Sequence, residues 1–164
     1  MKVLRPVAAL LLLLIGSLIA AAPALARGDV VAFRSGYQPG TIVVATGQRQ
    51  LFYVVDQERA IRYPVGVGRA GMAWHGTAYV AAKHIRPAWA RIPGRTPTYP
   101  GGSPNNPMGA AAMGLDRGNY AIHGTNDPTS IGGFVSHGCI RMLNEDIMDL
   151  YGRTPIGTEV HVLR

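Results

Sequence analysis

The sequence predicts a single, mainly β domain, built as an antiparallel β-sandwich or partly closed barrel with one or two short helices. Three observations lead to this prediction. Short runs of β-branched and aromatic residues are separated by turn-like breaks, and clear helical periodicity is confined to one segment near the C-terminus. The 138 residues that follow an apolar leader are also enough for one hydrophobic core.

Residues 1–26 are expected to be a signal peptide that lies outside the fold. Lys2 and Arg5 make its start positive, residues 7–22 form an apolar run, and Ala24-Leu25-Ala26 presents small residues where an export peptidase cuts. The run of sixteen residues is shorter than the roughly twenty that a membrane-spanning helix needs. We therefore predict cleavage after Ala26, with an uncleaved membrane anchor as the alternative.

The catalytic domain is predicted to span 41–164, after a lead-in at 27–40 that shows no firm periodicity. Three β-type runs follow one another with two polar breaks between them, at residues 41–45, 50–55 and 60–65. We expect them to form a meander. Pro64 should lie at an edge or at the end of its strand, because proline has no N–H to donate to a sheet.

Two apparent ligand signals in the middle of the chain are rejected. Residues 66–71 match the dinucleotide-binding pattern Gly-x-Gly-x-x-Gly, but no helix pattern opens after Gly71 and no acid lies about twenty residues on. His75 and His84 have no Cys, Asp or Glu at metal-ligand spacing. We therefore predict neither a cofactor nor a metal site, and we expect a strand at 77–81.

A proline-rich segment, residues 86–107, is the longest irregular stretch of the chain. It contains six prolines together with Trp89 and Tyr99. Proline restricts the conformations of a loop, and functional residues are frequent on loops. We predict a lid or wall over the site, with Trp89 and Tyr99 facing the substrate; a surface loop without function is the alternative.

The last third of the chain predicts four further elements. Residues 108–115 are apolar enough for a short buried strand or turn, and Tyr120–His123 suits a strand that delivers His123 at its end. A helix should follow with Asn144 as its N-cap and Gly152 as its stop. Residues 157–163 alternate as a closing strand.

The segment between His123 and Cys139 contains the strongest functional signal. Fifteen residues separate the two, and loops of this length in compact domains are usually functional or disordered. A free thiol has a pKa of about 8.5 and needs a base to become a good nucleophile. Either His123 or His137 can supply that base, and Gly138 permits a turn that exposes backbone N–H groups to an oxyanion. The alternative is a buried structural cysteine beside two ordinary loop histidines.

Cysteine count and charge narrow the functional class. Cys139 is the single cysteine, so an exported chain gains no internal disulfide from it, and a catalytic role explains its presence. The net charge is +7, or about +5 without the leader. The arginines of the chain are scattered, without basic runs or interleaved aromatic residues. This pattern argues against nucleic acid as the binding partner and favours another anionic polymer.

These residues resemble the L,D-transpeptidase (YkuD-type) catalytic domain of bacterial cell-wall enzymes. The resemblance depends on Ile122-His123-Gly124-Thr125-Asn126, on Ser136-His137-Gly138-Cys139-Ile140-Arg141-Met142 and on Asn144-Glu145-Asp146, and it extends from about Thr41 to the C-terminus. This chain departs from the family where Ala73-Trp74-His75-Gly76-Thr77 replaces the usual Thr-Pro-x-Gly. That departure concerns the rim of the site.

The resemblance implies a role for each site residue. Cys139 is the nucleophile, His123 the general base, and the Gly124 carbonyl orients the imidazole. The N–H groups of His137, Gly138 and Cys139 form an oxyanion hole. The expected substrate-binding set is Ser136, Arg141, Trp89 and Tyr99, with Arg141 meeting a substrate carboxylate.

The resemblance also implies the reaction and its location. The enzyme would act on peptidoglycan stem tetrapeptides through a cysteine acyl-enzyme, without a cofactor. It would join the acyl group to an amine of a neighbouring stem or of a wall-attached lipoprotein. We expect it in the periplasm, or else outside the cell or in the wall, and in contact with a membrane only if its leader is retained.

Three other functions remain open at this level. An L,D-carboxypeptidase would use the same residues with water as the acceptor. A sortase-like cysteine transpeptidase also orders His, Cys and Arg along the chain. A non-enzymatic zinc or wall-binding module would use His123, His137 and Cys139 as ligands.

Overall fold

A computed structural model describes residues 28–89 and 99–164. The predicted leader at 1–26 lies outside the described residues, as does the central part of the proline-rich segment, residues 90–98. Within the described part of the chain, no helix combines the length and the apolar character that crossing a membrane requires.

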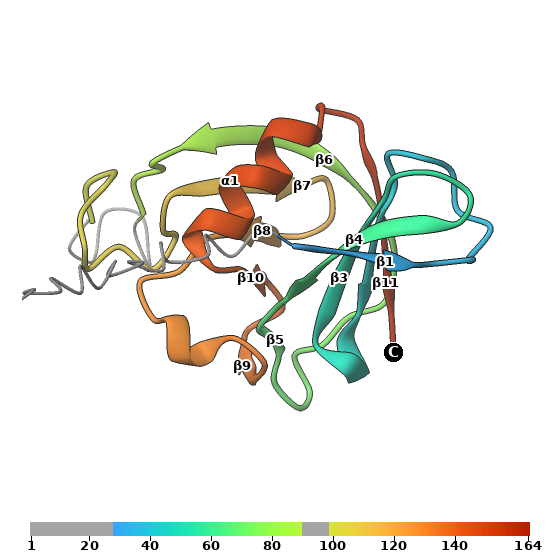
Figure 1. The fold of residues 1–164 in the computed structure, drawn as a ribbon. Helices are drawn as coiled ribbons and strands as arrows, with labels where there is room; N and C mark the ends of the chain where they lie inside the picture. The colour runs from blue at the N-terminus through green and yellow to red at the C-terminus, as the bar shows by residue number, and fades with distance from the viewer. Residues whose placement is uncertain (1–27, 90–98) are drawn as a thin grey trace, which may run out of the picture.

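The fold is mainly β with one α-helix, as predicted (Figure 1). The described residues form a nine-stranded sheet in the order β1-β4-β3-β2-β11-β6-β7-β8-β10 and a two-stranded sheet of β5 and β9. The strands are β1 Asp29–Ala32, β2 Ile42–Ala45, β3 Gln50–Val54, β4 Arg59–Pro64, β5 Val67–Gly68, β6 Gly76–Ile85, β7 Ala111–Leu115, β8 Ala121–His123, β9 Phe134–Ser136, β10 Ile140–Arg141 and β11 Glu159–Leu163. The helix α1 spans Asn144–Arg153, and short 3-10 turns lie at Thr46–Gln48 and Pro128–Ser130.

The predicted meander is present, because β2, β3 and β4 pair antiparallel in chain order and Pro64 is the last residue of β4. The lead-in differs from the prediction. Its residues Asp29–Ala32 form β1, which pairs antiparallel with β4 at the edge of the sheet. This strand is mostly exposed, so it lacks the alternation of buried apolar residues by which a strand is recognised in a sequence.

The nine-stranded sheet also contains parallel pairs of strands, which join segments far apart in the chain. The closing strand β11 pairs parallel with β2 and antiparallel with β6. At the other end of the sheet, β10 pairs parallel with β8, which places Arg141 beside His123. The segment after Gly71 enters β6 without an intervening helix, as its residue pattern predicted.

Apolar residues are buried on both faces of the sheet. In β2, Val43 belongs to a small cluster with Phe52, whereas its neighbours Ile42 and Val44 point into the main core. Ile147 and Leu150 of α1 complete that core. Burying α1 in this way stabilises the helix that directly follows the cysteine loop, and Figure 1 shows α1 crossing over the β7 and β8 end of the sheet.

The ends of α1 differ from the prediction by a residue or more. Leu143 occupies the N-cap position and makes no side-chain cap, while Asn144 is the first helical residue. The helix also passes through Gly152 and ends at Arg153. Asn144 does not cap the helix because its side chain binds two other segments, which are described with the site below.

Asp146, in the first turn of α1, is a buried acid without a hydrogen-bond partner among the described residues. Burial raises its pKa to about 7, and the negative charges of Glu145, Asp149 and Asp29 add to the effect. Because the folded-state pKa is above the unfolded value of 3.8, the neutral acid stabilises the fold at low pH. That stabilisation is lost as the pH rises through about 7.

We therefore expect Asp146→Asn to raise the free energy of unfolding at pH 8 by about 2 kcal/mol, with a much smaller gain at pH 4. Denaturant unfolding at the two pH values measures the difference. The exposed neighbour provides a matched control, since Glu145→Gln should give no comparable gain. A stability difference that does not change with pH would contradict the prediction.

Candidate active site

His123 is the last residue of β8 and lies between β7 and β10. Its Cα is in register with Ala112 on one side and with Arg141 on the other. The side chain is 4% exposed, and its Nδ1 lies 2.6 Å from the carbonyl oxygen of Gly124. A carbonyl oxygen can only accept, so Nδ1 carries the proton and Nε2 keeps its lone pair. The hydrogen bond predicted for Gly124 is thus present, and it leaves Nε2 able to act as a base.

The imidazole of His123 is held in its neutral form. Burial lowers its pKa to about 4, and the charge of Arg141 acts in the same direction, while the bond to Gly124 partly opposes them. At neutral pH the ring is therefore unprotonated. The ring can therefore accept a proton, and it adds no positive charge to the resting site.

Cys139 follows the turn that leaves β9 and is half-buried. Burial raises the pKa of its thiol, although the N–H of Ala121 and the charge of Arg141 counteract part of this effect. Sγ also lies 3.9 Å from the carbonyl oxygen of Asn119, a contact in which a protonated thiol is the donor. The resting site thus holds a neutral thiol and a neutral imidazole, and formation of a thiolate requires a base.

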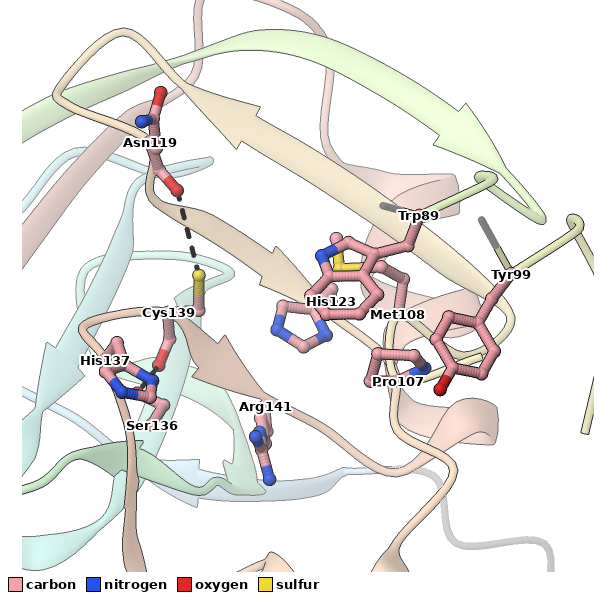
Figure 2. Close-up of a pocket in the computed structure, with 10 residues that line it drawn as sticks. All are labelled: Trp89, Tyr99, Pro107, Met108, Asn119, His123, Ser136, His137, Cys139 and Arg141. Carbon is pink, nitrogen blue, oxygen red and sulfur yellow. Dashed lines mark hydrogen bonds between the residues drawn. The ribbon is translucent and has the colours of Figure 1, made fainter. Parts of the chain in front are cut away.

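Cys139 and His123 line the same pocket, which has a volume of about 750 Å³ (Figure 2). Most of the residues predicted for the site line it as well. The full lining is Trp89, Tyr99, Pro107, Met108, Asn119, His123, Ser136, His137, Cys139 and Arg141. Asn119 was missed, because only its backbone carbonyl meets the thiol and a backbone contact leaves no signal in the residue type.

The turn before Cys139 is held by Ser136. The buried Ser136 hydroxyl donates to the Cys139 carbonyl at 2.6 Å and accepts from the Gly138 N–H at 3.0 Å. The Gly138 N–H is therefore not free to meet an oxyanion, contrary to expectation. Among the described residues, the N–H groups of His137 and Cys139 have no hydrogen-bond partner. The Ser136 hydroxyl, predicted to bind substrate, is engaged within the turn.

His137 faces a cation rather than the thiol. Its side chain is exposed, and its Nε2 lies 2.8 Å from the guanidinium of Arg69. An arginine N–H can only donate, so Nε2 of His137 is the acceptor in this pair. The arrangement favours His123 over His137 as the base for Cys139.

Asn144 connects the segment after His123 to the segment before β7. Its Oδ1 accepts from the N–H of Ala110 at 2.9 Å and from that of Thr125 at 3.2 Å, and its Nδ2 donates to the Thr125 carbonyl at 2.9 Å. A Cβ at Gly109 or Gly124 would overlap the Asn144 amide, which explains why glycine occupies both positions. Asn144 thereby supports the Gly124 carbonyl that orients His123.

The described ends of the proline-rich segment form one wall of the pocket. Trp89 and Tyr99 exchange two backbone hydrogen bonds of 3.0 and 2.7 Å, and their ring centroids lie 5.8 Å apart. The buried Asn106 ties the base of the segment, since its side chain donates to the carbonyls of Pro87 and Pro100. The lid function itself stays a prediction, because residues 90–98 lie outside the described part.

A family model for the YkuD L,D-transpeptidase catalytic domain matches residues 39–162. The chain belongs to the L,D-transpeptidase family. The match agrees with the resemblance seen in the sequence, and it decides against the sortase-like alternative.

Relatives and solved structures agree with this membership. The L,D-transpeptidase domain is 35% identical to the probable L,D-transpeptidase ErfK/SrfK of Escherichia coli K12, over 76% of this chain and 44% of the relative. It is 33% identical to the putative L,D-transpeptidase YkuD of Bacillus licheniformis, over 89% of this chain and 84% of that protein. An NMR structure of the catalytic domain of the Enterococcus faecium L,D-transpeptidase, acylated by ertapenem, has a TM-score of 0.61 and 21% identity, covering 79% of this chain and all of that one. The fold is therefore shared, although this chain spans less than half of the Escherichia coli relative.

The L,D-transpeptidase pocket does not gather side chains in the pattern of a metal site. Within residues 28–89 and 99–164, no group of three or more His, Cys, Asp and Glu is placed to hold a metal ion. His137, one of the three ligands of the zinc-module alternative, faces the cationic Arg69 instead.

Proposed function

We propose that the protein is an L,D-transpeptidase that acts on peptidoglycan stem tetrapeptides through an acyl-enzyme on Cys139. The observation that carries the proposal is the shared pocket, which is lined both by the single thiol and by a buried imidazole whose Nε2 is unprotonated. The family membership supplies the class of reaction. The stem tetrapeptide as substrate and the amine as acceptor are both proposed for this protein.

In the first half of the reaction, Cys139 Sγ attacks the carbonyl that joins an L-centre to the terminal D-residue. His123 Nε2 takes the thiol proton, which removes the cost of keeping a buried thiolate in the resting site. The carbonyl oxygen becomes an oxyanion facing the N–H groups of His137 and Cys139. When the C–N bond breaks, His123 returns the proton to the leaving amine, and the D-amino acid departs.

In the second half, an amine of a neighbouring stem attacks the thioester. His123 accepts a proton from this amine, the C–S bond breaks, and Cys139 receives the proton as its thiol re-forms. The product is a new amide cross-link, and the enzyme returns to its starting state. No cofactor enters either half of the reaction.

Arg141 contributes a positive charge to both halves. It neighbours His123 in the sheet, and its charge lowers the pKa of both His123 and Cys139. A substrate carboxylate entering the pocket would meet this guanidinium, which suits the acidic stem peptides of peptidoglycan. Trp89 and Tyr99 supply an aromatic wall on the side of the pocket away from Cys139 (Figure 2), against which the stem can pack.

The experiment that tests the function is incubation of the protein with purified stem tetrapeptides, with mass spectrometry of the products. We expect loss of the terminal D-residue together with a cross-linked dimer when an acceptor amine is present. A tripeptide formed equally with and without the amine would instead make the enzyme an L,D-carboxypeptidase. The absence of both products would overturn the proposal, and elemental analysis of the purified protein would then test the zinc-module alternative.

Carbapenems offer a second route to the same acyl-enzyme. The Enterococcus faecium domain of shared fold is acylated by ertapenem. We propose that Cys139 likewise opens the β-lactam ring and retains the drug as a covalent adduct, which intact-protein mass spectrometry detects.

We further propose that residues 1–26 export the enzyme to the periplasm and are removed after Ala26, and that a wall-attached lipoprotein is a second class of acceptor. Cell fractionation and N-terminal sequencing of the mature chain test the export and the cleavage. Supplying such a lipoprotein in place of a stem amine tests the acceptor.

A further inference from the structure

Trp74 lies in the connection between β5 and β6, within the segment where this chain departs from the family pattern. Its side chain is 8% exposed and is absent from the lining of the pocket. The indole Nε1–H donates to the carbonyl oxygen of Gly138 at 2.9 Å, across 64 positions of sequence. A buried side chain from a distant segment therefore binds the residue next to Cys139.

This bond determines the direction of the peptide that joins Gly138 to Cys139. None of the described peptides is cis, and in a planar trans peptide the C=O and the N–H point in opposite directions. Because the Gly138 carbonyl points at the buried indole, the Cys139 N–H points away from it. That N–H has no hydrogen-bond partner among the described residues, and Cys139 lines the pocket.

The indole is itself held in place. Its ring stacks on Tyr120 with centroids 5.1 Å apart and planes 4° from parallel, and the Arg117 guanidinium lies 5.2 Å from its centroid. The Tyr120 ring also lies where a Cβ on Gly138 would be, and Gly138 has φ of 120°, a conformation that favours glycine. The turn is thus confined by Tyr120 while Trp74 binds its carbonyl.

We infer that Trp74 is a positioning residue, whose indole N–H turns the Cys139 N–H toward the oxygen of the reacting carbonyl. The inference rests on the proposed acyl transfer at Cys139. Trp74 touches neither the thiol nor the substrate and acts through the Gly138–Cys139 peptide. A tryptophan suits this task because its indole N–H is a donor without acceptor capacity, so it can bind the carbonyl alone.

The test compares Trp74→Phe, which keeps an aromatic ring against Tyr120 but lacks the donor, with the matched control Tyr120→Phe. Within the described residues the Tyr120 hydroxyl makes no hydrogen bond, so the control alters the same stack without removing a bond. Three measurements are made on each variant and on the wild type. They are the rate of acylation by a carbapenem, the rate of thiol alkylation by iodoacetamide, and the Cys139 amide resonance in a ¹H–¹⁵N NMR spectrum.

We expect Trp74→Phe to slow acylation by about 10-fold to 100-fold, because an oxyanion donor is misdirected. Alkylation develops no oxyanion and should stay within about twofold of wild type. The Cys139 amide resonance should shift in Trp74→Phe and not in Tyr120→Phe.

An unchanged Cys139 amide resonance, acylation at the wild-type rate, or equal losses of acylation and alkylation would each overturn the inference. The last result would mean that Trp74 supports the fold or the thiol in general. Failure of the wild type to be acylated concerns the proposed function instead, and in that case the amide resonance decides the role of Trp74 by itself.

Discussion

Cys139→Ser should abolish transpeptidation of stem tetrapeptides, with a loss of about 10⁴-fold or more, while the fold stays intact. The neutral imidazole of His123 can accept a proton from a thiol, but a serine hydroxyl is far less acidic than a thiol and a poorer nucleophile in the same position. The oxygen is also smaller than sulfur, so the half-buried site accommodates the change. Product analysis by mass spectrometry measures the loss, and circular dichroism checks the fold.

A carbapenem should add its mass to the wild-type protein and leave the Cys139→Ser variant unmodified. Cys139 is the single cysteine, so no other thiol can form a thioester in its place. Retained turnover, or labelling of the serine variant at the wild-type rate, would remove the nucleophile assignment.

His123→Ala should lower the acylation rate by about 10² to 10⁴-fold, whereas His137→Ala should lose much less. His123 is buried with Nε2 unprotonated, while His137 is exposed and its Nε2 is paired with Arg69. The two variants serve as controls for each other, because both histidines line the same pocket. The reverse order of losses would identify His137 as the base.

The pH dependence of the wild-type acylation rate, on its acid side, tests the same assignment. Because burial lowers the pKa of His123 to about 4, the base should stay active well below the ordinary histidine value of 6.5 and lose activity as the pH falls through about 4. The folded-state pKa is below the unfolded value, so the contribution of His123 to stability is present above about 6.5 and declines as the pH falls toward 4. Rates must therefore be measured at pH values where circular dichroism shows a folded protein. A loss of activity that begins well above pH 4 would contradict the assignment of His123 as the base.

Strands with buried apolar residues were predicted closely, and exposed or irregular ones were not. The runs at 41–45, 50–55 and 60–65 correspond to β2, β3 and β4 within one or two residues. The mostly exposed β1 shows no alternation of apolar and polar residues. Where a strand is mostly exposed, the residue types along it carry little information about pairing.

The residue types also did not show which of several possible hydrogen-bond partners a polar group binds in the folded protein. Asn144 suits a helix N-cap, yet its amide binds backbone groups of Ala110 and Thr125 that the fold brings to it. The Gly138 N–H was expected to be free, yet it meets the Ser136 hydroxyl. Each is a competition between hydrogen-bond partners, and relative position in three dimensions determines its outcome.

The amino-acid sequence by itself determined the β class, the family resemblance and the pair of residues, His123 and Cys139, to which the chemistry is proposed to belong, because these follow from residue types and short spacings. Only the tertiary structure decided that β10 lies parallel to β8 with Arg141 beside His123, and that Trp74 binds the carbonyl next to Cys139. Both contacts join segments far apart in the chain. Their geometry arises from the packing of the whole core, and no local pattern of residues encodes it.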